Sequence, residues 1–182
     1  MAEQEVKLMK GNEALAHAAI RCGCDGYFGY PITPQTEVIE TLSELKPWET
    51  TGMVVLQAES EVASINMLYG GGGTGKRVMT SSSSPGVSLM QEGISYMAGA
   101  EVPGLIVDVQ RGGPSTGLPT KSEQTDLLQV LYGRNGESPM PVIAATSPTD
   151  CFSAAYMAAK IALEHLTPVV LLTDAFIAYG SA

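Results

Sequence analysis

The sequence contains few residues able to bind a metal. Its 182 residues include two histidines and three cysteines, Cys22, Cys24 and Cys151. Their spacing matches neither a disulfide framework nor the four-thiolate sets that hold zinc or an iron–sulfur cluster. The cysteines are therefore predicted to be buried structural thiols, and no metal site is expected on this chain.

Positive charge is also scarce. Ten lysines and arginines stand against nineteen aspartates and glutamates, which gives a net charge of -9 and an isoelectric point near 4.6. This balance opposes nucleic-acid binding, which needs a basic surface.

No apolar run approaches the ~18 residues that span a bilayer, so no membrane span is expected. Residues 1–7 lack the basic and apolar segments of a secretory signal, and a cytoplasmic location is expected.

Short β-rich runs and helical stretches alternate along almost the whole chain. Strands are expected at residues 27–29, 53–56, 78–81, 105–109, 142–145 and 169–173. Helices are expected at 12–21, 34–46, from 59 to the glycine run at 70, and at 86–98, 123–132 and 148–165. The alternation predicts a doubly wound α/β fold, with six mainly parallel strands and helices on both faces of the sheet. Residues 1–182 are expected to form one domain, the first part of a longer polypeptide.

Several helices carry local signals. Pro34 is expected in the first turn of its helix, where a missing N–H does no harm. Thr120 and Glu123 form a capping-box pattern, and Ser147 precedes Pro148 at a predicted first helical position. In the helix after the second strand, the positions expected to face the core are Val62, Ile65, Asn66 and Tyr69.

Residues 70–76 (GGGGTGK) have the glycine and lysine spacing of a nucleotide-binding P-loop. However, Arg77 stands where the coordination of Mg²⁺ requires serine or threonine. The run also follows a helix and precedes a strand, which is the reverse of the P-loop arrangement. A flexible connection from helix to strand is therefore favoured over nucleotide hydrolysis, which is kept as an alternative.

Polar residues gather just after the predicted strands. Residues 29–34 (GYPITP) follow the first strand, and residues 57–62 (QAESEV) follow the second. Active sites of α/β proteins lie at such strand ends. The acids Glu59 and Glu61 are also favoured at a helix start for structural reasons alone. Residues 80–86 (TSSSSPG) either line a ligand cleft or cap the next helix.

Arg111 follows the fourth predicted strand and precedes Gly112, Gly113 and Pro114, which allow a sharp bend. Its guanidinium could grip a substrate carboxylate through two hydrogen bonds. It could equally pair with a structural carboxylate such as Asp108. The residues alone leave both interpretations open.

The sequence resembles the N-terminal part of the alpha subunit of 2-oxoacid:ferredoxin oxidoreductases, which use thiamine diphosphate. The resemblance covers nearly the whole chain, and its opening segments are most similar to the 2-ketoisovalerate (branched-chain) and 2-oxoglutarate types. It is carried by residues 29–34 (GYPITP), 57–62 (QAESEV), 111–120 (RGGPSTGLPT), 121–127 (KSEQTDL) and 132–139 (YGRNGESP). It implies the thiamine diphosphate-binding fold and, for residues 1–182, its pyrimidine-binding domain.

The resemblance also implies roles for individual residues. Glu61 matches the catalytic glutamate that hydrogen-bonds a pyrimidine ring nitrogen of the cofactor, with Glu59 as its local competitor. Thr33 and Arg111 match positions that contact the substrate, and Pro31 and Thr33 match positions that line the cofactor. Ser84 stands where a glycine is common, and it is expected to be strained if that position needs a positive φ.

Partners are implied as well. The chain lacks the elements that bind Mg²⁺ and the diphosphate, so the resemblance implies a beta subunit that carries them. Iron–sulfur clusters are expected on partner chains, together with gamma and ferredoxin-like delta subunits, with ferredoxin as electron acceptor and coenzyme A as co-substrate. The implied reaction is oxidative decarboxylation of a 2-oxoacid to an acyl-CoA. The alternative is a non-catalytic assembly module that completes a partner's cofactor site.

Overall fold

A computed structural model describes residues 6–182. Residues 1–7 were expected not to form a secretory signal, and most of that segment lies outside the described residues. Within these residues six strands form one sheet in which every neighbouring pair is parallel. They are β1 (Gly26–Gly29), β2 (Val54–Gln57), β3 (Val78–Ser82), β4 (Gly104–Gln110), β5 (Val142–Ala144) and β6 (Pro168–Asp174). Their order across the sheet is β2-β1-β3-β4-β6-β5. The predicted doubly wound fold is confirmed.

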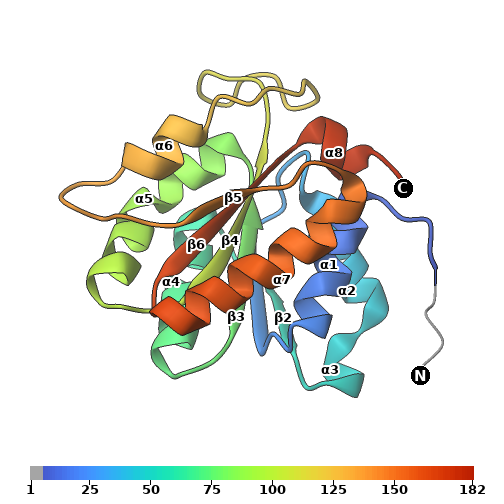
Figure 1. Ribbon diagram of the computed structural model, residues 1–182, viewed down its shortest axis with the longest axis horizontal. Helices are drawn as coiled ribbons and strands as arrows, with labels where there is room; N and C mark the ends of the chain where they lie inside the picture. The colour runs from blue at the N-terminus through green and yellow to red at the C-terminus, as the bar shows by residue number, and fades with distance from the viewer. Residues whose placement is uncertain (1–5) are drawn as a thin grey trace.

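The helices lie on both faces of the sheet. They are α1 (Gly11–Arg21), α2 (Thr36–Leu45), α3 (Pro47–Thr50), α4 (Glu61–Gly73), α5 (Ser84–Gly99), α6 (Leu127–Tyr132), α7 (Pro148–His165) and α8 (Ala175–Tyr179). Figure 1 shows α1, α2 and α7 on one side of the sheet and α4, α5 and α6 on the other. The short helices α3 and α8 were not predicted. No helix in residues 6–182 is both long and apolar enough to cross a membrane.

Two apolar layers hold these helices to the sheet. One joins α1, α2 and α7 to the sheet through buried residues such as Leu15 and Leu42, with alanines along α7. The other joins α4 and α5 to the opposite face through residues such as Leu68 and Ile94. The central strands β4 and β6 are buried along their whole length, as expected for parallel strands covered on both faces. Because the two layers hold the helices against the sheet, they fix the positions of the strand ends at which the candidate active site lies.

Four predicted helix starts differ from the structure by two residues or more. Helix α4 begins at Glu61 rather than at residue 59, and α5 begins at Ser84 rather than at residue 86. The other two are α2 and α6. Helix α2 begins at Thr36, because Pro34 lies in the preceding turn, where its carbonyl accepts a hydrogen bond from Asn12 Nδ2 at 2.8 Å. Helix α6 begins at Leu127, and the carboxylate of Glu123 accepts a bond from the N–H of Gly113 at 2.8 Å rather than closing a capping box. In both cases tertiary contacts replace the local signal.

The start of α7 is confirmed. The hydroxyl of Ser147 accepts a hydrogen bond from the N–H of Asp150 at 3.1 Å, and Pro148 is the first helical residue. The glycine run lies before β3 at the amino ends of the strands, as predicted, but residues 70–73 belong to the end of α4, so the connection itself is shorter than expected.

The inward face predicted for α4 is partly wrong. Ile65 is buried, but Val62 and Asn66 are exposed and Tyr69 is only partly buried. The buried residues are instead Glu61, Ser64, Ile65, Leu68 and Gly72. These positions also recur at helical spacing, so the helix is rotated by about one residue from the expected orientation. This rotation turns the first residue, Glu61, toward the sheet.

Candidate active site

Four neighbouring strands end at one edge of the sheet and bring the predicted site residues together. Because the strands are parallel, the loops after β2, β1, β3 and β4 all leave from their carboxyl ends. The strand order reverses between β1 and β3, and ligands of open α/β sheets bind at such a switch point. Thr33 and Arg111 lie at this edge on the loops after β1 and β4, and Glu61 lies there at the start of α4, which follows β2. Pro31 lies in the turn after β1 and lines a shallow hollow with Gln57 of β2.

Glu61 is the first residue of α4, and its side chain is turned inward. The preceding residue, Ser60, caps the helix by accepting a hydrogen bond from the N–H of Ala63 at 3.1 Å. Glu61 is only 7% exposed, yet its carboxylate has no hydrogen-bond partner among residues 6–182. The helix N-terminus favours a negative charge at this position. The carboxylate is thus held in place while its oxygens remain available to a ligand.

Gly86 of α5 packs directly against Glu61. A Cβ atom at this position would lie 2.9 Å from Glu61 Oε1, 2.8 Å from its Cγ and closer still to the hydroxyl of Ser82. The hydroxyl oxygens of Ser82 and Ser83 are buried and have no hydrogen-bond partner within the described residues. We call these four residues the carboxylate cradle. It combines the carboxylate of Glu61, the unpaired hydroxyls of Ser82 and Ser83, and the backbone of α5 at Gly86, where there is no side chain.

Arg111 follows β4 and bridges two loops. Its Nη1 donates to the carbonyl of Thr33 at 2.8 Å, and its Nη2 donates to the carbonyl of Thr116 at 2.7 Å. The interpretation that Arg111 pairs with Asp108 is therefore wrong. Two of its five N–H groups are used, and of the other three the buried Nε–H has no acceptor in residues 6–182. The guanidinium is fixed and still has donors for a carboxylate.

The positive charge of Arg111 interacts with the negative charge of Glu61 in the carboxylate cradle. Burial lowers the pKa of the guanidinium, and the negative charge of Glu61 opposes that change. Arginine stays protonated in proteins at physiological pH. A cation and an anion therefore stand near each other at this edge of the sheet.

The turn that carries Thr33 is held by a buried chain of hydrogen bonds that the sequence analysis missed. Tyr27 and Ser81 hydroxyls lie 2.6 Å apart, Ser81 also donates to Gln35 Oε1 at 2.6 Å, and Gln35 Nε2 donates to the carbonyl of Tyr30 at 2.8 Å. Tyr27, Ser81 and Gln35 are fully buried. The chain links β1, β3 and the turn. Its only signal in the sequence was the position of Gln35 beside the GYPITP run.

Ser84 is not strained. It is the first residue of α5, and it is absent from the residues with positive φ in the described chain. Its hydroxyl bonds the carboxylate of Asp126 and accepts from the N–H of Arg111 at 3.0 Å. The side chain therefore supports the site rather than disturbing the backbone.

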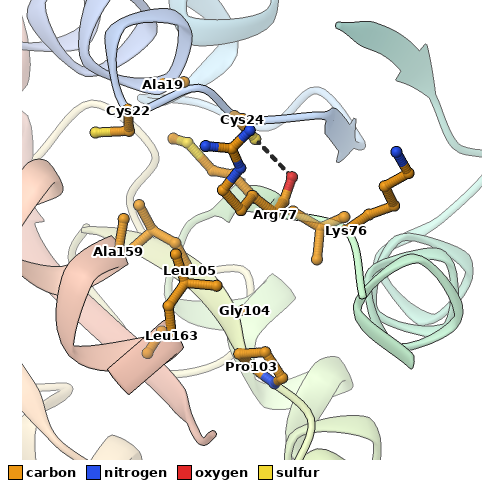
Figure 2. A pocket seen from close by; sticks show the side chains of 13 residues that line it. Ala19, Cys22, Cys24, Lys76, Arg77, Pro103, Gly104, Leu105, Ala159 and Leu163 are labelled. Atoms are coloured by element: carbon orange, nitrogen blue, oxygen red, sulfur yellow. Dashed lines mark hydrogen bonds between the residues drawn. The ribbon is translucent and has the colours of Figure 1, made fainter. Parts of the chain in front are cut away.

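The cysteines lie away from this edge. Cys24 and Cys151 are buried as predicted, whereas Cys22 is partly exposed. Figure 2 shows the thiol of Cys24 donating to the carbonyl of Arg77, at 3.3 Å, beside an apolar hollow at the amino ends of the strands. Burial raises the pKa of Cys24 to about 12 and that of Cys151 to about 11, so both thiols are unreactive. At about 30 Å³ the hollow holds little more than a water molecule.

Comparison with known proteins identifies relatives along the whole chain. Residues 17–181 match the family described as pyruvate flavodoxin/ferredoxin oxidoreductase, thiamine diphosphate-binding. The chain is 47% identical to 2-oxoglutarate oxidoreductase subunit KorA of Mycobacterium tuberculosis, over 97% of this chain and 27% of that protein. It is 46% identical to ketoisovalerate oxidoreductase subunit VorB of Methanothermobacter thermautotrophicus, over 93% of this chain and 47% of that protein.

A solved structure is similar as well. The 2-oxoglutarate:ferredoxin oxidoreductase from Magnetococcus marinus, with 2-oxoglutarate, coenzyme A and succinyl-CoA bound, superposes with a TM-score of 0.93 and is 40% identical. The match covers 98% of this chain and 31% of that one. The chain thus spans between about a quarter and a half of the length of these relatives. It belongs to the thiamine diphosphate-binding family of pyruvate flavodoxin/ferredoxin oxidoreductases.

Proposed function

We propose that residues 1–182 are the pyrimidine-binding domain, from the N-terminal part of the alpha subunit, of a 2-oxoacid:ferredoxin oxidoreductase. The enzyme would oxidatively decarboxylate a 2-oxoacid to an acyl-CoA and pass the electrons to ferredoxin. Relatives named for 2-oxoglutarate and for ketoisovalerate are almost equally similar to the chain, at 47% and 46% identity, so both acids are candidate substrates. The observation that carries the proposal is the inward-turned, unpartnered carboxylate of Glu61.

The carboxylate cradle fits the pyrimidine end of thiamine diphosphate. An aminopyrimidine ring is flat and has ring nitrogens that need hydrogen-bond partners, and Glu61 offers a free carboxylate at a fixed position. Gly86 leaves room for the side chain of Glu61 against the backbone of α5, and Ser82 and Ser83 offer buried hydroxyls without partners in the described residues. When bound, thiamine diphosphate supplies the electron sink needed to break the bond between a carboxylate and its neighbouring carbonyl carbon.

Glu61 would hold the proton that the pyrimidine ring nitrogen exchanges. This task needs a carboxylate within hydrogen-bond reach of the ring and shielded from water. Its position as the first residue of α4 and its low exposure meet both requirements. Glu59, the competitor, is exposed and precedes the helix, which disfavours it.

Arg111 and Thr33 would orient the 2-oxoacid. Arg111 is held by two backbone carbonyls and retains donors that can take a carboxylate in a fork. The partly buried residue Thr33 has a hydroxyl without a partner within residues 6–182, and this hydroxyl would contact the oxo or carboxylate group. Pro31, two residues earlier, would line the cofactor with its rigid ring.

This chain supplies only part of the enzyme. Within the described residues no cluster of histidine, cysteine, aspartate or glutamate is arranged to hold a metal. We assign Mg²⁺ and the diphosphate to a beta subunit, and the iron–sulfur clusters to partner chains that include gamma and ferredoxin-like delta subunits. Coenzyme A would be the co-substrate, and the complex would be cytoplasmic.

The test is viologen reduction by the purified complex of the full-length subunit and its partners. It is offered 2-oxoglutarate, 2-ketoisovalerate and pyruvate with coenzyme A and thiamine diphosphate. We expect reduction with one of the first two acids. No reduction by a complex loaded with cofactor and with intact clusters would instead support the assembly module, as would failure of the thiazolium C–H to exchange in deuterium oxide.

The cradle itself makes a prediction. Gly86→Ala is expected to lower turnover about 100-fold, because the new methyl group would displace the Glu61 carboxylate, and misplacing a catalytic group by about 1 Å can cost that much. Gly70→Ala is the matched control, since this helical glycine has open space around it. That variant is expected to keep full turnover. Equal turnover of the two variants would show that the cradle does not hold the reacting groups.

A further inference from the structure

A cluster of buried polar side chains ties together the two ends of the loop that carries Arg111. The loop, residues 111–126, joins β4 to α6 and rises at the top of Figure 1. Ser84 bonds both ends, because its hydroxyl accepts from the N–H of Arg111 at 3.0 Å and donates to the carboxylate of Asp126. We call Ser84, Asp108, Gln110 and Asp126 the loop anchor.

Gln110, at the end of β4, also holds Asp126 in place through hydrogen bonds. Its Oε1 accepts from the N–H of Asp126 at 3.0 Å, and its Nε2 donates to the carbonyl of Thr173 on β6 at 3.2 Å. Ser84, Gln110, Arg111 and Asp126 are all at most 8% exposed. Asp126 is therefore held through its backbone by Gln110 and through its side chain by Ser84.

Asp108 lies near Asp126, and its carboxyl group has no hydrogen-bond donor in the described residues. It is fully buried in β4, and neither carboxyl oxygen has an N–H or O–H donor in residues 6–182. The group that faces it is the carboxyl of Asp126. Burial raises the pKa of Asp108 well above its usual range, and the negative charge of Asp126 raises it further. An unpaired charge in a protein interior is costly, so full burial and the lack of any donor in residues 6–182 favour the neutral acid, whose O–H the neighbouring carboxylate of Asp126 can accept.

The other charges around the loop leave this contact undisturbed. The guanidinium of Arg111 is engaged by the carbonyls of Thr33 and Thr116. On the neighbouring strand β6, Asp174 accepts from Gln124 of the loop at 2.6 Å. Glu61 acts on Arg111 across the site. None of these groups is a hydrogen-bond partner of Asp108.

We propose that Asp108 is a positioning residue for Arg111: as a neutral acid it donates a hydrogen bond to Asp126, and this bond keeps Asp126 on Ser84 and the start of the loop in place. The role rests on the proposed function, since its effect on catalysis requires that Arg111 bind the substrate carboxylate. Without the donor, Asp126 would face an apolar wall in a buried site and would turn away from Ser84.

Two substitutions test the need for a donor. Asp108→Asn keeps the shape and an N–H donor toward Asp126, whereas Asp108→Leu keeps the branching at Cγ in a larger side chain that has no donor. In the full-length subunit within its complex, Asp108→Leu is expected to raise KM for the active 2-oxoacid about tenfold or more, the effect of losing one charged hydrogen bond. Its kcat should change much less, and Asp108→Asn should restore KM to within about twofold of wild type.

A second measurement does not depend on activity. Amide hydrogen exchange of residues 111–126 is expected to be faster in Asp108→Leu than in Asp108→Asn or wild type, with exchange in α7 unchanged. Asp25→Leu serves as a control, because this carboxylate bonds the N–H of Arg77 at 2.8 Å, at the opposite end of the sheet. It should alter neither KM nor exchange in the loop.

The outcomes distinguish the two proposals. If Asp108→Leu leaves both KM and loop exchange at wild-type values, the positioning role is overturned. The same holds if Asp108→Asn behaves like Asp108→Leu, because the effect would then come from packing. If loop exchange responds but substitution of Arg111 does not change KM, the anchor exists and the role of Arg111 in binding substrate is wrong.

The protonation of Asp108 gives a prediction for stability. Because its pKa is raised in the folded protein, folding takes up a proton above the usual carboxyl pKa of about 3.9, and wild type loses stability as pH rises toward the folded value. Asp108→Asn has no such loss. Its advantage in unfolding midpoint over wild type is therefore expected to widen as pH rises above about 5. A gap that stays constant as pH rises would show that Asp108 is ionised in the folded protein.

Discussion

Glu61→Gln is expected to lower 2-oxoacid-dependent viologen reduction by at least about 100-fold while the complex still assembles. Glutamine has nearly the same shape and can occupy the first position of α4, but it can neither carry the negative charge nor exchange the proton. The carboxylate has no partner in the described chain, so its loss leaves no broken internal hydrogen bond to destabilise the fold. Turnover is measured beside size-exclusion chromatography of the complex.

Glu59→Gln is the matched control. Glu59 lies two residues earlier and is exposed, so its substitution is expected to leave turnover within about twofold of wild type. Deuterium exchange at the thiazolium carbon should fail in Glu61→Gln and persist in Glu59→Gln. Retained turnover in Glu61→Gln, or a loss in Glu59→Gln instead, would show that Glu61 does not act on the cofactor.

Most strands were predictable because they are short, largely apolar runs bounded by glycine, proline or polar residues. Residues 105–109 and 169–173 contain only one charged residue, Asp108, and the structure extends each strand by one residue at each end. Buried parallel strands need apolar residues on both faces, which leaves a clear mark in the sequence. Helix α7 was predicted with its observed bounds because Ser147 and Pro148 give a local start signal.

The errors arose where a local sequence pattern was compatible with two different structures. In α4 both the observed and the expected stripes recur at helical spacing, and the observed one includes the acid Glu61. Apolarity therefore favoured the wrong stripe, because a pattern based on apolar residues does not expect a buried acid. At Glu123 the capping pattern was real, but the carboxylate is used 10 residues away, at Gly113.

The site was only partly predictable for a similar reason. Strand ends indicated one edge of the sheet, the resemblance selected Glu61, Thr33 and Arg111, and the structure brings these three residues together at that edge. The supporting contacts join distant positions, since Ser81 and Gln35 are 46 residues apart and Ser84 and Asp126 are 42 apart. No periodicity or motif within one segment reports such pairs. Only the folded chain shows that the serine run supports both the turn at Thr33 and the loop at Arg111.

Arg111→Lys is expected to raise KM for the 2-oxoacid about 30-fold or more, as loss of a charged, desolvated contact does. Lysine is a single point charge and cannot at once reach the carbonyls of Thr33 and Thr116 and present a fork to a carboxylate. The loop should therefore loosen and the substrate lose its clamp, with KM changing more than kcat.

Arg134→Lys provides the comparison. Arg134 also donates to backbone carbonyls, those of Val130, Leu131 and Ser138, and burial lowers the pKa of its guanidinium as it does for Arg111. It lies after α6, beyond the loop that carries Arg111, so its substitution should disturb local structure without raising KM. A similar KM for both variants would mean that the two arginines share a structural role, and the substrate carboxylate would then need another partner. A rise in Arg111→Lys alone would place the carboxylate of the 2-oxoacid between the loop after β1 and the loop after β4, beside Glu61.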